Sequence, residues 1–93
     1  MHSETWEEVV VTSVIMPQMG SDMTAGIIQA WLKREGDTVE KGEPLVQIET
    51  EKAVVEIEAP ATGTVRVIYA SEGSEVPVTE VIAIIADPDE ELQ

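Results

Sequence analysis

Lys52 lies in the segment 48–57, between two stretches of strand-forming residues, and is one of only five cationic residues in a chain of 93. A lysine that acts as a base or forms a Schiff base must lose its proton readily, through burial or a cationic neighbour. Glu49 and Glu51 have the opposite effect, because nearby anions favour the charged ammonium. The sequence therefore predicts a lysine that is presented to another enzyme. A lysine that only keeps a turn solvated is the alternative.

The composition limits the possible functions. The chain carries 19 acidic and five basic residues, a net charge of −14, which argues against binding nucleic acid or an anionic membrane surface. It has no cysteine, and its apolar runs are shorter than the ~20 residues that a membrane span needs. No Ser/His/Asp set or glycine-rich phosphate loop is present, and the only histidine is His2. A stand-alone enzyme is therefore disfavoured.

The sequence contains an internal repeat. Shifted by 37 positions, residues 35–37 fall on 72–74 and residues 45–48 fall on 82–85. Upstream, residues 14–17 fall on 57–60 with a shift of 43, so the first half has six extra residues within 18–25. An insertion that interrupts a repeat is usually a surface loop.

Short strands separated by turns account for both halves. Apolar residues alternate along 53–59 and along Val65, Val67 and Tyr69, and no stretch has a convincing helical period. This pattern predicts an all-β flattened barrel or sandwich, in which two copies of one half-motif pack about a pseudo-two-fold axis.

A hairpin with residues 51 and 52 as its loop aligns the apolar residues on one face. Gln47 then pairs with Glu56 on the solvent face. The repeat predicts that segments 10–16 and 83–87 pair as 53–59 and 46–50 do, so the chain ends should emerge together, opposite Lys52. The residue pairs on the core face of the hairpin are Val46 with Ile57, Ile48 with Val55, and Thr50 with Ala53.

Over residues 14–86, the chain resembles the lipoyl domains of the dihydrolipoamide acyltransferase component of 2-oxo acid dehydrogenase complexes. Glu51 stands where aspartate is common in that family. The residues that carry the resemblance are Met16-Pro17, Gly20, Met23, Gly26, Trp31-Leu32, Glu35-Gly36-Asp37, Val39, Lys41-Gly42-Glu43, residues 48–53, Glu58-Ala59-Pro60 and Gly63.

The resemblance implies two four-stranded antiparallel sheets and a lipoate joined to Lys52 by an amide bond. The domain itself would be a non-catalytic carrier, belonging to a dihydrolipoamide acyltransferase or working with one. Its partners would be a thiamine-diphosphate 2-oxo acid dehydrogenase, the acyltransferase catalytic domain, dihydrolipoyl dehydrogenase and a lipoate-attaching enzyme. The insertion would be the loop near the lipoyl lysine that helps the dehydrogenase recognise its own domain.

The resemblance also assigns recognition roles around Lys52. Each recognition residue also has a purely structural explanation. Residues of the lysine hairpin could simply be solvated turn positions, Met19 and Met23 could fill gaps in the core, and Gly20 could be needed for a special backbone conformation. The recognition residues are Glu49, Thr50, Glu51, Ala53, Met19 and Gly20.

We expect a flexible leader at 1–8, the carrier domain at 9–87 and an acidic tail or linker start at 88–93. The chain would be either an excerpt of a longer acyltransferase or a freestanding carrier. The expected location is the bacterial cytoplasm or the mitochondrial matrix. A biotin carrier, a glycine-cleavage carrier and an unmodified β-sandwich interaction module are the rivals. The biotin family flanks its lysine with methionines, whereas Glu51 and Ala53 flank Lys52, and the glycine-cleavage carrier is longer with a different lysine context.

Overall fold

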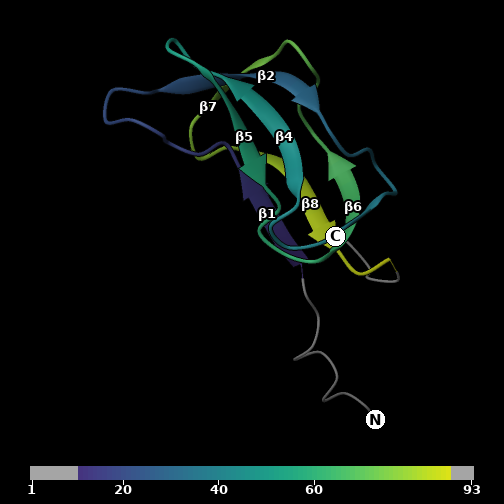
Figure 1. Ribbon diagram of the computed structural model, residues 1–93. Helices are drawn as coiled ribbons and strands as arrows, with labels where there is room; N and C mark the ends of the chain where they lie inside the picture. The colour runs from purple at the N-terminus through teal and green to yellow at the C-terminus, as the bar shows by residue number, and fades with distance from the viewer. Residues whose placement is uncertain (1–10, 89–93) are drawn as a thin grey trace.

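A computed structural model describes residues 11–88 of the chain (Figure 1). The expected leader, with His2, and the expected tail apart from Pro88 lie outside these residues. The described part contains no helix, and therefore none that could cross a membrane. Its eight strands are β1 (Val11–Ile15), β2 (Ala25–Trp31), β3 (Thr38–Val39), β4 (Pro44–Glu49), β5 (Val54–Glu58), β6 (Gly63–Ile68), β7 (Glu75–Pro77) and β8 (Val81–Ala86).

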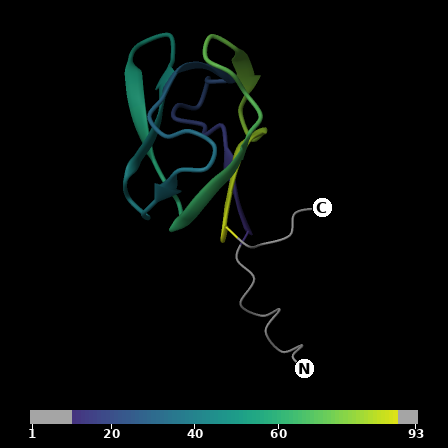
Figure 2. The ribbon, with the colours of Figure 1, turned by 90° about the vertical axis from the view of Figure 1, so that its right-hand side faces the viewer.

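The strands form two four-stranded antiparallel sheets that face each other, as the side view in Figure 2 shows. One sheet has the order β1-β8-β6-β3 and the other has the order β5-β4-β2-β7. The expected sandwich is confirmed. The repeat relates β1–β4 to β5–β8, and the two sheet orders correspond strand by strand under this relation. Each sheet contains strands of both halves, so neither half can complete a sheet alone.

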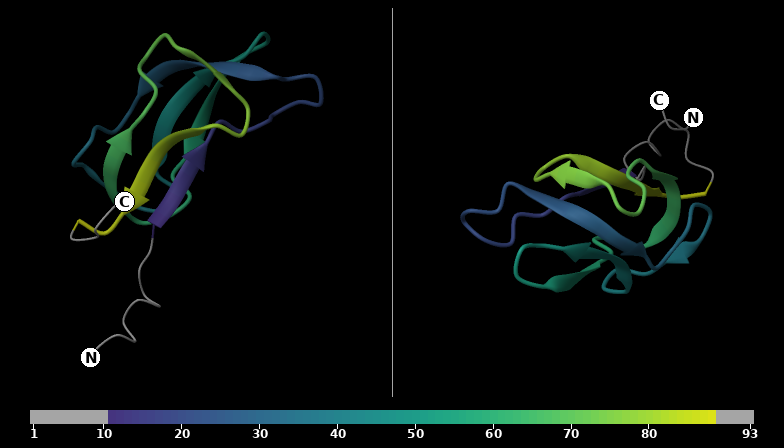
Figure 3. Two further views of the ribbon diagram at one scale, coloured as in Figure 1. Left: turned by 180° about the vertical axis from the view of Figure 1, so that it is seen from behind. Right: turned by 90° about the horizontal axis from the view of Figure 1, so that it is seen from above.

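The register of the β4–β5 hairpin and of the β1–β8 pair agrees with the sequence prediction. In the β4–β5 pair, Val46 lies opposite Ile57 and Ile48 lies opposite Val55. In the β1–β8 pair, Thr12 lies opposite Ile85, which is the equivalent pairing. Because Val11 and Ala86 are paired, the chain enters and leaves the domain at one end. The β4–β5 turn lies at the opposite end (Figures 1 and 3).

Two carboxylates accept backbone N–H groups that have no strand partner, each in the opposite half of the repeat. The short strand β7 pairs only with residues 25–27 of β2, so the N–H of Trp31 has no strand partner on that side. The Glu72 carboxylate accepts this N–H at 2.9 Å. In the other half, the Glu35 carboxylate accepts the N–H of Ile68 at 2.7 Å, because β3 is also short. Each half thus satisfies a backbone donor of the other.

The core between the sheets is built from aliphatic side chains, and no polar side chain of the described residues is buried in it. Ile48 and Ile85 are fully buried, and each contributes about 1.5–3 kcal/mol. They occupy equivalent positions beneath glycines. A Cβ at Gly26 would lie 2.8 Å from Ile48 Cγ2, and one at Gly63 would lie 3.0 Å from Ile85 Cγ2.

The predicted alternation in β6 is wrong at its end. The register with β8 shifts between Val65 and Val67, which is a β-bulge. A bulge reverses the faces on which the following side chains lie. Ile68 therefore packs against the core, and Tyr69 is 62% exposed. An equivalent shift occurs in β2 between residues 28 and 30.

Candidate functional site

Lys52 lies in the four-residue turn 50–53 that joins β4 to β5, and its side chain is exposed. The N–H of Thr50 donates to the carbonyl of Ala53 at 2.8 Å, which closes the base of the turn. The Thr50 hydroxyl bonds inside the turn as well. Its Oγ1 accepts the N–H groups of Lys52 and Ala53, both at 3.2 Å, and it donates to the Ala53 carbonyl at 3.0 Å.

Within residues 11–88, Lys52 forms no ion pair, and no group of three potential metal ligands occurs. A partner enzyme can therefore reach its amine without breaking an existing interaction. Because the turn projects from the end of the sandwich, its entry into a foreign active site requires no unfolding. The arrangement suits a lysine that another protein modifies.

A depression of about 270 Å³ separates the turn from the loop that precedes β2. Met19, Met23 and Ala25 provide apolar lining. Met19 is 38% exposed, whereas Met23 packs against the core and its sulfur accepts the N–H of Met19 at 3.3 Å. A second depression of about 280 Å³ adjoins the first, sharing Ala25, Thr50, Glu51 and Glu75 with it. Together they form a groove along the base of the lysine turn.

The groove brings together residues that the sequence suggested and others that it did not. Glu49, Thr50 and Glu51 line it, and Met19 and Gly20 come from the loop. Ala53 is exposed in the turn but is absent from this lining. Glu75 was missed, because nothing in the sequence showed that the start of β7 would lie against β2 beside the turn. Asp22 was not singled out, although it lies in the insertion that was expected near the lysine.

Two details of the insertion differ from the expectation. Ala25 is the first residue of β2, so the loop ends at Thr24. Gly20 does not have a positive φ, and a Cβ there would meet only the Asp22 carboxylate, at 3.8 Å. The backbone therefore does not require glycine at position 20.

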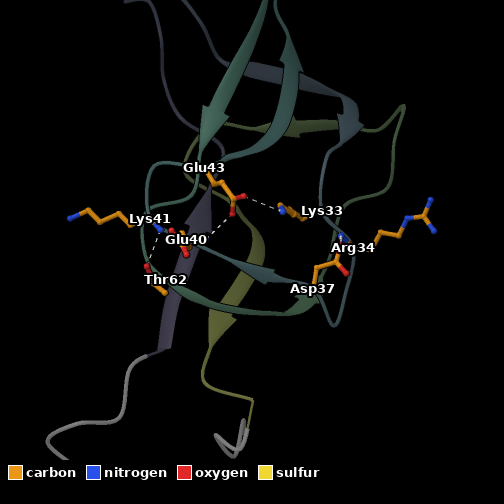
Figure 4. A network of polar contacts seen from close by, with 7 residues as sticks. All are labelled: Lys33, Arg34, Asp37, Glu40, Lys41, Glu43 and Thr62. Atoms are coloured by element: carbon orange, nitrogen blue, oxygen red, sulfur yellow. Dashed lines mark hydrogen bonds and ion pairs between the residues drawn. The ribbon is translucent and has the colours of Figure 1, made fainter.

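The cationic residues are unevenly distributed along the domain, whereas acidic residues occur at both ends. Asp22, Glu49, Glu51 and Glu75 line the groove at the Lys52 end. The other four cationic residues lie toward the opposite end, three of them in the network of Figure 4. They are Lys33, Arg34, Lys41 and Arg66.

In that network, the Glu43 carboxylate accepts the N–H of Glu40 at 2.9 Å and lies 3.4 Å from the Lys33 ammonium (Figure 4). The Glu40 N–H, with a smaller contribution from Lys33, holds the pKa of Glu43 below its ordinary value. Arg66 donates to the carbonyl of Asp87 at 2.6 Å, where the last strand ends. These interactions tie down the turns at the end from which the chain leaves.

Comparison with known proteins identifies close relatives. A family model described as "Biotin-requiring enzyme" matches residues 12–85. The chain is 49% identical over 78 residues to the dihydrolipoyllysine-residue acetyltransferase component of the pyruvate dehydrogenase complex of Corynebacterium glutamicum, covering 84% of this chain and 12% of that protein. It is 43% identical over 84 residues to the corresponding component of the acetoin cleaving system of Bacillus subtilis, covering 90% of this chain and 21% of that protein.

A plant relative and a solved structure agree with these matches. Component 3 of the mitochondrial pyruvate dehydrogenase complex of Arabidopsis thaliana is 46% identical, covering 83% of this chain and 14% of that protein. The chain thus spans between 12% and 21% of the length of these relatives. The solution structure of the lipoyl domain of the 2-oxoglutarate dehydrogenase complex from Azotobacter vinelandii superposes with a TM-score of 0.67 at 30% identity, covering 78% of this chain and 92% of that one.

Proposed function

This chain belongs to the lipoyl domains of the biotin- and lipoyl-attachment family, and we propose that it is a carrier domain whose Lys52 holds lipoate in amide linkage. The observation that carries the proposal is the position of Lys52: exposed, at the apex of a projecting turn, at the end opposite the chain ends. An amide at this amine removes the one cationic charge among the described residues that line the groove, and it displaces no existing contact of theirs.

Lipoate, when attached, supplies a dithiolane whose disulfide can be reduced and acylated, chemistry that a chain without cysteine lacks. The contribution of the protein is to present the arm. The paired strands β4 and β5 hold the turn away from the sandwich, and the exposed amine extends the reach. Tethering keeps the arm at a high effective concentration near the partner active sites.

We propose that the groove beside Lys52 is where partners dock. The partners would be a thiamine-diphosphate 2-oxo acid dehydrogenase, an acyltransferase catalytic domain, dihydrolipoyl dehydrogenase and a lipoate-attaching enzyme. The acidic lining favours partner surfaces rich in Lys and Arg, and exposed Met19 offers an adaptable apolar contact. Glu49, Glu51 and Gly20 would contribute to recognition there, and Ala53 would contact partners from the turn.

The relatives include components from bacteria and from plant mitochondria. We therefore propose the bacterial cytoplasm or the mitochondrial matrix as the location. The 2-oxo acid that the complex processes is not specified by the groove, since relatives act in pyruvate and acetoin systems.

The intact mass of the protein from its native source tests the attached group. A lipoyl increment supports the proposal. A biotinyl increment would make the chain a biotin carrier, and an unmodified mass in cells that lipoylate other proteins would favour an interaction module. Glu51 and Ala53 beside Lys52 favour the lipoyl result, because the biotin family places methionines at these positions.

A further inference from the structure

We propose that Thr50 is a positioning residue for the modification of Lys52, and that it acts by holding the backbone of the turn, without contacting the modifying enzyme. This inference rests on the proposed function, since it concerns the presentation of the same lysine. It assigns to Thr50 a role different from the recognition role that the family resemblance implies.

The hydroxyl of Thr50 is fully used within the turn. A threonine hydroxyl has one proton to donate and two lone pairs to accept. Its proton is directed to the Ala53 carbonyl, and its lone pairs accept the N–H groups of Lys52 and Ala53. No hydrogen-bonding capacity remains for a partner protein. The bonds nevertheless fix the two peptide units on either side of the lysine side chain.

The turn needs this support because its loop residues are unsuited to a tight hairpin. Two-residue hairpin loops prefer turns with positive φ, which match the twist of the strands and favour Gly or Asn. Neither Glu51 nor Lys52 has a positive φ. The N–H of Ala53 then donates to the side-chain Oγ1 of Thr50 at 3.2 Å, in the place of the backbone carbonyl that would normally close such a hairpin. The threonine side chain thus substitutes for a missing backbone bond.

The substitution Thr50→Val tests the role, because valine keeps the shape of threonine and removes the three hydrogen bonds. The turn is exposed, so water can replace part of these bonds, and the melting temperature should fall by only a few degrees. The fraction of molecules in which the turn holds the observed backbone conformation should fall. We expect kcat/KM for lipoate attachment to decrease about 5- to 10-fold, the equivalent of one net hydrogen bond. Amide hydrogen exchange at residues 52 and 53 should accelerate by a similar factor.

Two matched variants serve as controls. Thr50→Ser retains the hydroxyl and should restore both attachment and exchange to nearly the wild-type rates. Thr62→Val removes a comparable bond at the opposite end, where Thr62 Oγ1 accepts the N–H of Lys41 at 2.9 Å. It should accelerate exchange at Lys41 and leave lipoate attachment unchanged.

The outcomes separate this inference from the proposed function. A wild-type chain that is not lipoylated overturns the proposed function and, with it, the link to modification, whereas the exchange rates still decide whether Thr50 holds the turn. Normal attachment to wild type with equal attachment to Thr50→Val overturns the positioning role. Reduced attachment to Thr50→Val without faster exchange at residues 52 and 53 overturns it as well, because Thr50 would then be a direct contact.

Discussion

Thr79 tests the internal symmetry from which the pairing of the first and last strands was predicted. Among the described residues it is the only non-glycine with a positive φ, at 75°. With the repeat shift of 37 positions, Thr79 is equivalent to Gly42, whose φ is 92°. The N–H of Thr79 donates to the Met16 carbonyl at 2.8 Å, and the N–H of Gly42 donates to the equivalent Ala59 carbonyl at 2.9 Å. Both turns therefore require the same backbone conformation, and only one of them has glycine.

The variant Thr79→Gly should consequently be more stable than the wild type. The left-handed conformation costs an L-residue about 1–2 kcal/mol, which glycine does not bear. Glycine in turn destabilises the folded state by about 0.5–1 kcal/mol, because it gives the unfolded chain more conformational freedom. The net gain should be about 0.5–1 kcal/mol, which corresponds to a rise in melting temperature of about 2–8 °C for a domain of this size.

The assay is calorimetric unfolding together with urea titration, in which the m-value should stay constant while the midpoint rises. Gly42→Ala is the matched control. A Cβ at Gly42 meets no atom within 4 Å, so its cost is purely conformational, and we expect a loss of about 1 kcal/mol. If Thr79→Gly lowered the midpoint, or if both variants shifted stability in the same direction, the equivalence of the two turns would be refuted.

Three further predictions concern the groove and the opposite end. Deleting residues 19–22 should slow reductive acylation by the dehydrogenase with little effect on lipoate attachment, and equal loss of both rates would argue against a recognition role for the loop. Neutralising Glu51 and Glu75 to glutamine should lower the on-rate for a basic partner and flatten its salt dependence, as measured by stopped flow. An unchanged salt slope would show that the acidic lining does not steer docking. Glu43 has a folded-state pKa below its unfolded value, so its stabilisation is complete above the unfolded pKa and is lost as pH falls through the folded pKa. Glu43→Gln should therefore weaken the dependence of stability on pH below about pH 4.5, and identical acid unfolding curves would contradict this reasoning.

The sequence predicted the register of the lysine hairpin from the pattern of its apolar residues. Apolar pairs such as Val46 with Ile57 can face one core only in a single register, and a slip of one residue would expose them. The repeat then predicted the β1–β8 pairing, since two similar half-sequences adopt similar strands.

The features that the sequence did not predict depend on contacts between strands that are distant in the sequence. The bulge near Val67 carries no glycine or proline signal, so the position of Tyr69 could not be read from alternation. The bonds from Glu35 and Glu72 to the opposite half arise from the shortness of β3 and β7. Glu75 reaches the groove only because β7 pairs with β2, a long-range contact that local patterns do not encode.

The central claim is that Lys52 alone carries the prosthetic group. The chain has two other lysines, Lys33 and Lys41, both toward the opposite end of the domain. Peptide-resolved mass spectrometry after incubation with a lipoate-attaching enzyme should locate the lipoyl group on Lys52 only, and Lys52→Arg should fold normally and gain no mass. Modification of Lys33 or Lys41, or a mass gain in the Lys52→Arg protein, would contradict the account.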